Sequence, residues 1–166
     1  MLKIRKFEDH DCQIISEAFS KQGWNKPIEQ YLEYFKEMEL GVRDVLIAEL
    51  DGQFAGYVTI LWTSDYTPFR ERGIPEIVDL NVLIRYRKMG IASLLLDEAE
   101  KRIRLISKFV GIGVGLFQDY GAAQRLYVKR GYVPDGKGIW TKDRHIGYGE
   151  KVIIDDDVAL YLIKEL

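Results

Sequence analysis

The sequence predicts a mixed α/β (α+β) fold, in which a mostly antiparallel central sheet of about six or seven strands carries helices on both faces. Two observations predict this fold. The pair Asp51-Gly52 separates two runs rich in β-branched and aromatic residues, which is the strongest short signal of a β-hairpin. Further along the chain, strand-like and helical segments alternate, and this order requires a parallel pair of strands near the centre of the sheet.

The elements expected in the first half follow from the period of the apolar residues. Alternation indicates a strand, whereas apolar residues three or four positions apart, as in the stripe from Ile28 to Met38, indicate a helix. In order, we expect a strand at Leu2–Phe7, a helix at Asp9–Phe19, a helix after Pro27, hairpin strands at Val45–Leu50 and Phe54–Trp62, and a polar loop at Thr63–Gly73.

The second half is read in the same way. Gly131 occupies a natural position just after a helix. In order, we expect a strand at Ile74–Leu83, a helix at Gly90–Ile106, a strand at Phe109–Phe117, a helix at Gly121–Arg130, short strands at Tyr132–Pro134 and Gly138–Thr141, and a last strand at Val158–Ile163. The insert Asp135–Asp157 is long for a hairpin loop, and its role as a lid or as a dimer element stays open.

Length and composition limit the class of protein. The chain has 166 residues without repeats or linkers, which indicates one domain over residues 1–166. Its net charge of -2 argues against a general nucleic-acid binder. A single cysteine, Cys12, cannot form an internal disulfide, and neither a signal peptide nor an apolar run of membrane-spanning length is visible. We therefore expect a cytoplasmic protein without membrane or nucleic-acid partners, and no metal, because His10 and His145 lack partners at metal spacing.

The segment from Leu80 to Ala92 carries the most specific signal. A strand ends, a basic turn with Arg87 and Lys88 follows, and Gly90 begins a long helix. The first amides of a helix are unpaired and lie at the positive end of its dipole, so that they bind phosphate groups well. The segment is neither a P-loop nor a dinucleotide fingerprint, because the required glycines and the Gly-Lys-Ser/Thr sequence are missing.

Two motifs at the proper spacing resemble those of one enzyme family. Arg87-Lys88-Met89-Gly90-Ile91-Ala92 resembles the Arg/Gln-x-x-Gly-x-Gly/Ala motif of the GNAT superfamily of acetyl-CoA-dependent N-acetyltransferases. Ala123-Gln124-Arg125-Leu126-Tyr127-Val128-Lys129-Arg130-Gly131-Tyr132 resembles the family's Ala-x-x-Leu-Tyr-x-x-x-Gly-Phe/Tyr segment. The expected element order also fits the acyl-CoA N-acyltransferase fold over nearly the whole chain.

The resemblance implies acetyl-CoA as co-substrate and a set of residues that bind it. The pyrophosphate would contact backbone amides of the basic turn, and the pantetheine arm would pair with the end of the preceding strand, where a backbone N–H, most of all that of Val82, would polarise the thioester carbonyl. The implied cofactor-binding residues are Leu80, Asn81, Val82, Arg87, Lys88, Met89, Gly90, Ile91, Ala92, Ser93 and Ala123.

The resemblance also implies the catalytic groups for direct attack of an amine on the thioester. Tyr127 matches the family tyrosine beside the sulfur, and a phenol is a proton donor at neutral pH. Glu76 aligns with the strand carboxylate that serves some members as general base, and Asp79, at the point where the family's strand usually bulges, is a second candidate. Strict alternation would place these two carboxylates on opposite faces of the strand, and a chain of water molecules is the remaining alternative.

One departure from the family pattern and the substrate side remain open. Tyr120 stands where the family often has an asparagine that contacts the cofactor arm, and Gln118 or Asp119 are possible substitutes. The segments that bind the acceptor in this fold contain Trp24, Trp62, Tyr66, Phe69, Trp140, His145 and Tyr148, which predicts an aromatic-lined cleft.

The function expected is N-acetylation of a primary amine on a small molecule, peptide or protein. A non-catalytic acyl-CoA-binding module or sensor is the main alternative, and a longer acyl group or a homodimer is left open. A redox or nucleotide enzyme is disfavoured by the missing glycines.

Overall fold

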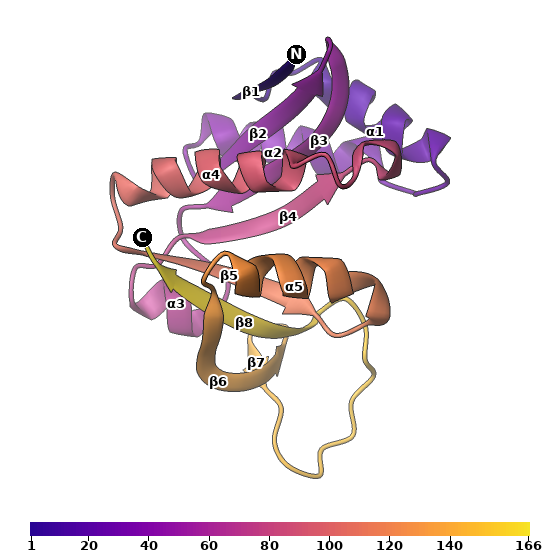
Figure 1. Cartoon of the computed structure of the whole chain (residues 1–166). Coiled ribbons are helices and arrows are strands. Elements are labelled where there is room, and N and C mark those ends of the chain that lie inside the picture. The colour runs from indigo at the N-terminus through magenta and orange to yellow at the C-terminus, as the bar shows by residue number, and fades with distance from the viewer.

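The computed structural model describes all residues from Met1 to Leu166 and contains one mixed sheet of eight strands (Figure 1). The strands are β1 Leu2–Lys6, β2 Arg43–Leu50, β3 Gln53–Leu61, β4 Glu76–Val82, β5 Phe109–Gly115, β6 Val133–Thr141, β7 Arg144–His145 and β8 Val158–Glu165. Their order across the sheet is β1-β2-β3-β4-β5-β8-β6-β7. Only β4 and β5 are parallel, which confirms the mostly antiparallel sheet with a parallel pair at its centre.

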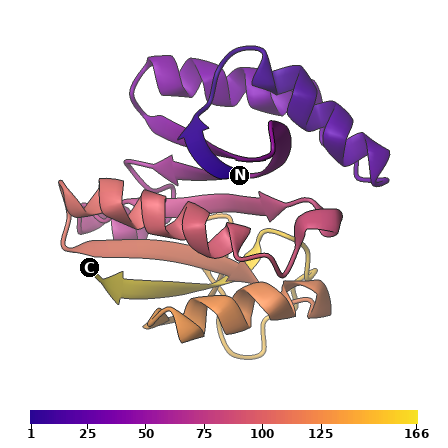
Figure 2. The same cartoon turned by 45° about the horizontal axis from the view of Figure 1, so that its top comes forward.

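Helices cover both faces of this sheet (Figures 1 and 2). They are α1 Asp11–Lys21, α2 Ile28–Glu39, α3 Thr67–Glu71, α4 Ile91–Arg104 and α5 Gly121–Lys129, with short 3₁₀ turns η1 Ile84–Tyr86 and η2 Gln118–Tyr120. On one face, Leu95 and Ile103 of α4 are fully buried against alternate residues of β2 and β3 such as Leu46. On the other face, Phe19 of α1 and Tyr31 of α2 are buried against the intervening residues.

The strands β4 and β5 separate soon after they meet. Their ladder contains only the pairs Glu76↔Gly111 and Ile77↔Ile112. β4 nevertheless continues along β3 as far as the pair Gly56↔Val82, with a register shift on the way. Because β4 stays with β3 while β5 stays with β8, a gap opens between the two halves of the sheet beyond Ile77.

Three glycines make one face of β5 flat, and each is covered by an aromatic ring. A Cβ atom on Gly111 would lie 2.1 Å from the Phe69 ring, one on Gly113 would lie 2.9 Å from the Tyr161 ring, and one on Gly115 would lie 2.5 Å from the Tyr120 ring. The alternate spacing places all three rings on the same face of the strand. The glycines are therefore required by close packing.

Most of the expected elements are confirmed. The hairpin turn at Asp51-Gly52 has positive φ at both residues, as the dipeptide predicts. The exposed Ile106 lies beyond the end of α4 and does not belong to its buried stripe.

Two expectations about the loops and the sheet edge are wrong. Thr63–Gly73 is not only a loop, because α3 forms where Pro68 occupies its first turn and Phe69 is buried. Tyr132–Pro134 and Gly138–Thr141 are not separate pieces, since β6 is one strand with a bulge between Pro134 and Ile139. β7 then pairs with β6 and makes an eighth strand.

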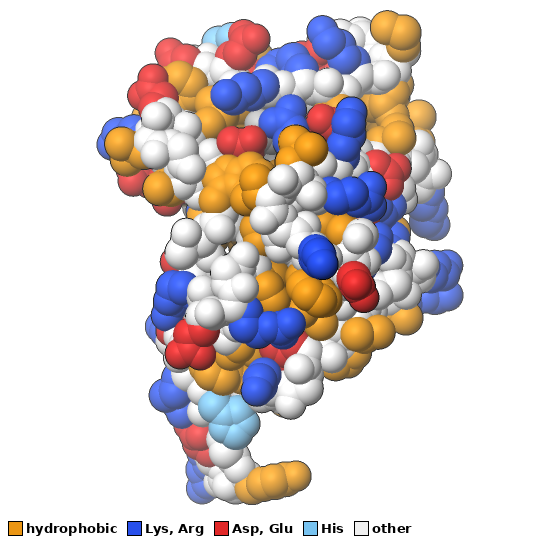
Figure 3. Space-filling model, turned by 90° about the vertical axis from the view of Figure 1, so that its left-hand side faces the viewer, with side chains coloured by type: hydrophobic (Ala, Val, Ile, Leu, Met, Phe, Trp, Pro, Cys, Tyr) orange, Lys and Arg blue, Asp and Glu red, His pale blue; other side chains and the backbone are white.

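The first part of the insert, up to His145, is therefore part of the sheet edge, and residues 146–157 form an irregular arm. This arm projects from the body of the molecule (Figure 3). Its apolar side chains Tyr148 and Ile153 are exposed.

Candidate active site

The turn before α4 presents a row of free amides. The N–H groups of the six residues Lys88–Ser93 donate to no backbone carbonyl, and the first donor within the helix is Leu94, which bonds the carbonyl of Gly90 at 3.1 Å. Both Lys88 and Gly90 have positive φ, of 63° and 79°. No side chain accepts a hydrogen bond from this turn, and nothing lies within 4 Å of the place where a Cβ of Gly90 would be. The turn is therefore an open cradle for an anion.

Basic side chains stand beside this cradle. The Arg87 guanidinium lies 5.3 Å from the centre of the Trp24 ring, and its Nε donates to the Val82 carbonyl at 3.4 Å. Arg85 lies over the ring of Tyr86 at 4.7 Å. Arg87 thus links the α1–α2 connection to the end of β4 while adding positive charge near the free amides.

The end of β4 offers backbone groups to the gap. Leu83 donates its N–H to Ala55 of β3 at 2.9 Å. Successive N–H groups of an antiparallel strand point to opposite edges, so that Val82, and by the same alternation Leu80, direct their N–H groups away from β3. That edge faces the gap, because the ladder to β5 ended at Ile77.

Tyr127 of α5 lies at the same gap. Its side chain is 6% exposed. Burial raises the pKa of its hydroxyl well above the usual range, and the nearby Tyr120 and Asp79 raise it further. No hydrogen bond within the protein contributes to that shift. The hydroxyl is therefore a protonated donor that the protein leaves without an acceptor.

Glu76 lies where β4 and β5 are still paired. Its side chain is 5% exposed, and one hydroxyl, Ser64 Oγ, donates to its Oε2 at 2.5 Å. The Ser64 oxygen is itself held by the backbone N–H of Tyr66 at 3.0 Å. Burial raises the pKa of the Glu76 carboxyl to about 7, although the Ser64 bond opposes this shift. The carboxyl can therefore exchange a proton near neutral pH.

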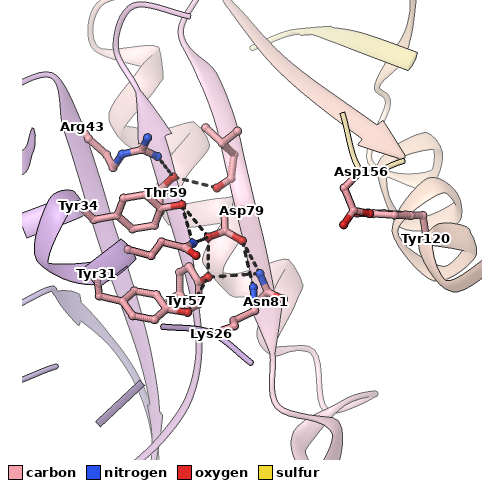
Figure 4. Close-up of polar contacts among 12 residues, drawn as sticks. Lys26, Tyr31, Tyr34, Arg43, Tyr57, Thr59, Asp79, Asn81, Tyr120 and Asp156 are labelled. Carbon is pink, nitrogen blue, oxygen red and sulfur yellow. Dashed lines mark hydrogen bonds and ion pairs between the residues drawn. The ribbon is translucent and has the colours of Figure 1, made fainter. Parts of the chain in front are cut away.

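Asp79 is held by a dense polar network (Figure 4). Its Oδ2 accepts hydrogen bonds from Tyr57 at 2.6 Å, Tyr34 at 2.9 Å and Gln30 at 3.1 Å, and its Oδ1 accepts from Asn81 at 2.6 Å. The donors come from β3, α2 and β4 itself, so that Asp79 joins three elements.

The two carboxylates lie on the same face of β4, and the expectation from strict alternation is wrong. Ile77 packs in the cluster with α4, so that its neighbour Glu76 faces the α2 side. Asp79 also faces that side, since its partner Tyr57 is buried with α1 and α2. The reason is the register shift at Asp79, whose φ is 54°.

Tyr120 occupies the opposite side of the gap (Figure 4). Its ring covers Gly115, and its hydroxyl donates to Asp156 at 2.8 Å. Burial, Asp156, Asp119 and Asp79 together raise the pKa of this hydroxyl to about 12. The residue that bonds the adjacent strand is Gln124, and not Gln118 or Asp119 as considered from the sequence. Its side-chain amide donates a hydrogen bond to the Gly115 carbonyl of β5 at 2.9 Å. The tyrosine therefore ties the arm at 146–157 to the gap.

The structure does not bring the expected aromatic residues into one cleft. Tyr66 and Phe69 are buried under α3, where Tyr66 also packs on Trp140. Tyr148 is fully exposed on the arm, and Trp24 alone lies beside the basic turn. Polar Gln30, Tyr34 and Tyr57, which the sequence did not single out, surround Asp79 instead; the i, i+4 spacing of Gln30 and Tyr34 on one helix was the only available signal.

A cavity of the structure lies away from these residues. It has a volume of about 820 Å³ and lies between α1 and the β2–β3 hairpin, lined among others by Ile14 and Phe54. It contains none of the residues predicted for catalysis or cofactor binding. The described chain also has no group of three or more His, Cys, Asp or Glu side chains arranged to hold a metal ion, and none of its helices is long and apolar enough to cross a membrane.

Comparison with known proteins decides the family. Residues 11–132 match the sequence profile of the acetyltransferase (GNAT) family. The chain belongs to this GNAT family. The matched GNAT region extends from the start of α1 to Tyr132, just before β6, and it includes the basic turn, β4, β5 and Tyr127.

Solved GNAT structures share this fold along their whole length. A ribosomal-protein-alanine N-acetyltransferase from Brucella melitensis is 19% identical, with 99% of each chain covered and a TM-score of 0.72. An N-acetyltransferase from Staphylococcus aureus Mu50 is 16% identical, with coverage of 99% and 98% and a TM-score of 0.73. The PaiA N-acetyltransferase of Thermoplasma acidophilum, solved with coenzyme A, is 15% identical, with coverage of 100% and 99% and a TM-score of 0.69. No curated protein sequence matches this chain significantly.

Proposed function

We propose that the protein is an N-acetyltransferase that transfers the acetyl group of acetyl-CoA to a primary amine of a small molecule, peptide or protein. The row of six free amides at Lys88–Ser93, beside the gap in the sheet, is the observation that supports this most. Membership in the GNAT family and the coenzyme A complex of a protein with the same fold agree with it.

The residues present fit acetyl-CoA. The six amides would hold its pyrophosphate, with Arg87 and Lys88 adding positive charge. The open edge of β4 at Leu80–Val82 would pair with the pantetheine arm, and the small Ala123 of α5 borders the same gap. Gly90 has a φ of 79°, a conformation that explains glycine at this position of the turn.

The chain's own groups can carry both proton transfers. Acetyl-CoA supplies a thioester, whose carbonyl carbon forms a bond to the amine nitrogen while the carbon–sulfur bond breaks. Glu76 takes the proton that the ammonium must lose, because burial raises the pKa of this carboxyl to about 7. Tyr127 donates a proton to the departing sulfur, and the N–H of Val82 donates to the carbonyl oxygen as negative charge develops.

Binding of acetyl-CoA is the first test, measured by calorimetry on the whole protein. The substitution Gly90→Glu places a carboxylate in the anion cradle, and we expect affinity to fall about 100-fold or more. Gly41→Glu is the matched control, since Gly41 also has positive φ and nothing within 4 Å of its missing Cβ but lies between α2 and β2. Equal loss in both variants, or in neither, would refute the cradle.

Release of the CoA thiol over a panel of amines tests catalysis. Tyr127→Phe should lower kcat about 100-fold and leave the affinity for acetyl-CoA almost unchanged. Tyr132→Phe is the control, because Tyr132 is equally buried but bonds Glu100 at 3.0 Å. Tight binding of acetyl-CoA without thiol release for any amine would favour the acyl-CoA-binding module, which needs neither Tyr127 nor Glu76.

A further inference from the structure

We propose that Asp79 is a positioning residue, whose carboxylate fixes the bulge in β4 and thereby directs the backbone N–H groups of Leu80 and Val82 into the gap. The inference rests on the proposed function, since these N–H groups matter only where they bind an acyl-CoA. It assigns Asp79 a role that differs from that of the general base.

The bulge is built around Asp79. On β3, Val58 alone lies between the paired residues Tyr57 and Thr59, whereas β4 places both Asp79 and Leu80 between their partners Asn81 and Val78. Two residues opposite one define a β-bulge, which bends its strand. Asp79 adopts a φ of 54°, a left-handed conformation that aspartate tolerates better than most residues because its short side chain can bond locally. The ladder to β5 ends two residues earlier, so that the bulge lies where the halves part.

The carboxylate is held from several directions. Besides the four hydrogen bonds from Tyr57, Tyr34, Gln30 and Asn81, the Lys26 ammonium lies 3.7 Å from Oδ1. The donors are themselves fixed. The Tyr57 hydroxyl lies 3.3 Å from the buried Tyr31 hydroxyl, and the Arg43 guanidinium lies 4.1 Å from the centre of the Tyr34 ring. A residue with these contacts cannot change its backbone conformation without breaking the network.

The same contacts argue against proton transfer at Asp79. A carboxylate offers about four lone-pair sites, two on each oxygen. Three hydrogen bonds already crowd Oδ2, so that a proton arriving there would have to displace a donor. Oδ1 accepts from Asn81 and lies 3.7 Å from the Lys26 ammonium, whose positive charge opposes the arrival of a proton. Glu76 accepts a single side-chain hydrogen bond, from Ser64, and keeps room for a proton.

Three substitutions separate the roles. Asparagine can adopt the left-handed conformation and can still accept from the tyrosines, glycine keeps only the backbone freedom, and alanine keeps neither. For acetyl-CoA affinity measured by calorimetry, we expect Asp79→Asn to stay within about 3-fold of the wild type, Asp79→Ala to lose at least about 10-fold, and Asp79→Gly to lie between them. Asp44→Ala is the control, because Asp44 has similar exposure, 23% against 19%, but pairs with Arg102 far from the gap.

Two further measurements distinguish a positioning role of Asp79 from a role as general base or as acceptor ligand. Amide NMR shifts of Leu80 and Val82 should move in Asp79→Ala and stay in Asp79→Asn. The pH profile of thiol release, with the best amine of the panel, should keep its acid limb in Asp79→Asn. Loss of that limb would make Asp79 the base, and a higher KM for the amine alone would make it an acceptor ligand; either result overturns the proposal, as does an Asp79→Ala variant that binds acetyl-CoA normally. A wild type that does not bind acetyl-CoA refutes the proposed function instead.

Discussion

The half-sheet of β1–β4 and the half-sheet of β5–β8 differ little in their internal bonding but are joined weakly to each other. Within the halves, β2 and β3 share eight residue pairs and β5 and β8 share seven, whereas β4 and β5 share two. α1 and α2 pack on the first half and α3 and α5 on the second, whereas α4 packs mainly on the first half and also contacts β5 (Figure 2). The proposed catalytic groups Glu76 and Tyr127 belong to different halves, so that chemistry depends on the junction.

Two buried glutamates sharpen this comparison. Glu76 and Glu100 are each 5% exposed, but Glu76 has one hydroxyl partner, whereas Glu100 of α4 bonds two cations, Lys164 of β8 at 2.8 Å and Arg130 at 3.1 Å. A buried carboxylate with two cations is satisfied and serves the fold. One without a cation can titrate, and its place at the junction indicates chemistry.

The largest expected effect is the loss of turnover in Glu76→Gln. We expect kcat to fall by about 10² to 10⁴-fold, because the amide cannot take a proton. In the wild type, kcat/KM should rise with pH and level off above about 7, where the carboxyl is ionised; the variant should lose this limb. Glu100→Gln is the control, and the rate of CoA thiol release is measured for both variants. An equal fall in kcat would show that the loss of any buried carboxylate lowers turnover, and would contradict a specific role of Glu76 as base.

The second effect, on stability, has the opposite sign. The native protein keeps the Glu76 proton up to about pH 7, whereas the unfolded chain releases it near the usual carboxyl pKa of 4.5. Wild-type stability contributed by this group is therefore lost as the pH rises across that window. Relative to the wild type, Glu76→Gln should gain roughly 3 kcal/mol of unfolding free energy between about pH 4 and about pH 8. Urea titrations at both values measure this, and a constant difference would contradict it.

The third effect concerns the other strand of the junction. Gly111→Ala places a Cβ 2.1 Å from the Phe69 ring and should lower the free energy of unfolding by about 1 to 3 kcal/mol. Gly121→Ala is the control, since nothing lies within 4 Å of its missing Cβ and its φ is -56°; it should raise stability by about 0.5 to 1 kcal/mol. Thermal melts that rank the two variants the other way would contradict the packing of α3 on β5.

The smallest effect is expected at Tyr120. Tyr120→Phe keeps the ring on Gly115 but removes the hydrogen bond to Asp156, an exposed bond worth about 1 kcal/mol or less. Limited proteolysis should cut the arm at 146–157 up to about 5-fold faster, with the melting temperature nearly unchanged. Tyr148→Phe is the control, because the Tyr148 side chain is fully exposed, and the arm of this variant should be cut at the wild-type rate.

Local signals predicted the elements and the anion cradle, because both depend on residues close in sequence. The Asp51-Gly52 turn needs only its own two residues, and the cradle needs Gly90 and the start of one helix. The polar surroundings of Asp79 depend on Tyr34 and Tyr57, 45 and 22 residues away. The family resemblance predicted a bulge at Asp79, but no local pattern named the partners toward which its side chain turns, and the alternation rule therefore failed at that residue.

The short helix α3 was missed for a related reason. A segment of five residues has too few apolar positions to show a helical period. Phe69 is buried because Gly111, 42 positions further on, leaves room for its ring. The contact between Phe69 and Gly111 exists only in the folded chain, and neither residue predicts it alone.

The aromatic covering of β5 has a consequence for the substitutions that this half of the sheet can accept. The three rings over Gly111, Gly113 and Gly115 come from α3, β8 and η2, which are separate stretches of the chain. Loss of one ring would leave a void over its own glycine, and a side chain added at that glycine would need the same space. Each glycine and the ring that covers it should therefore change together, as three independent pairs.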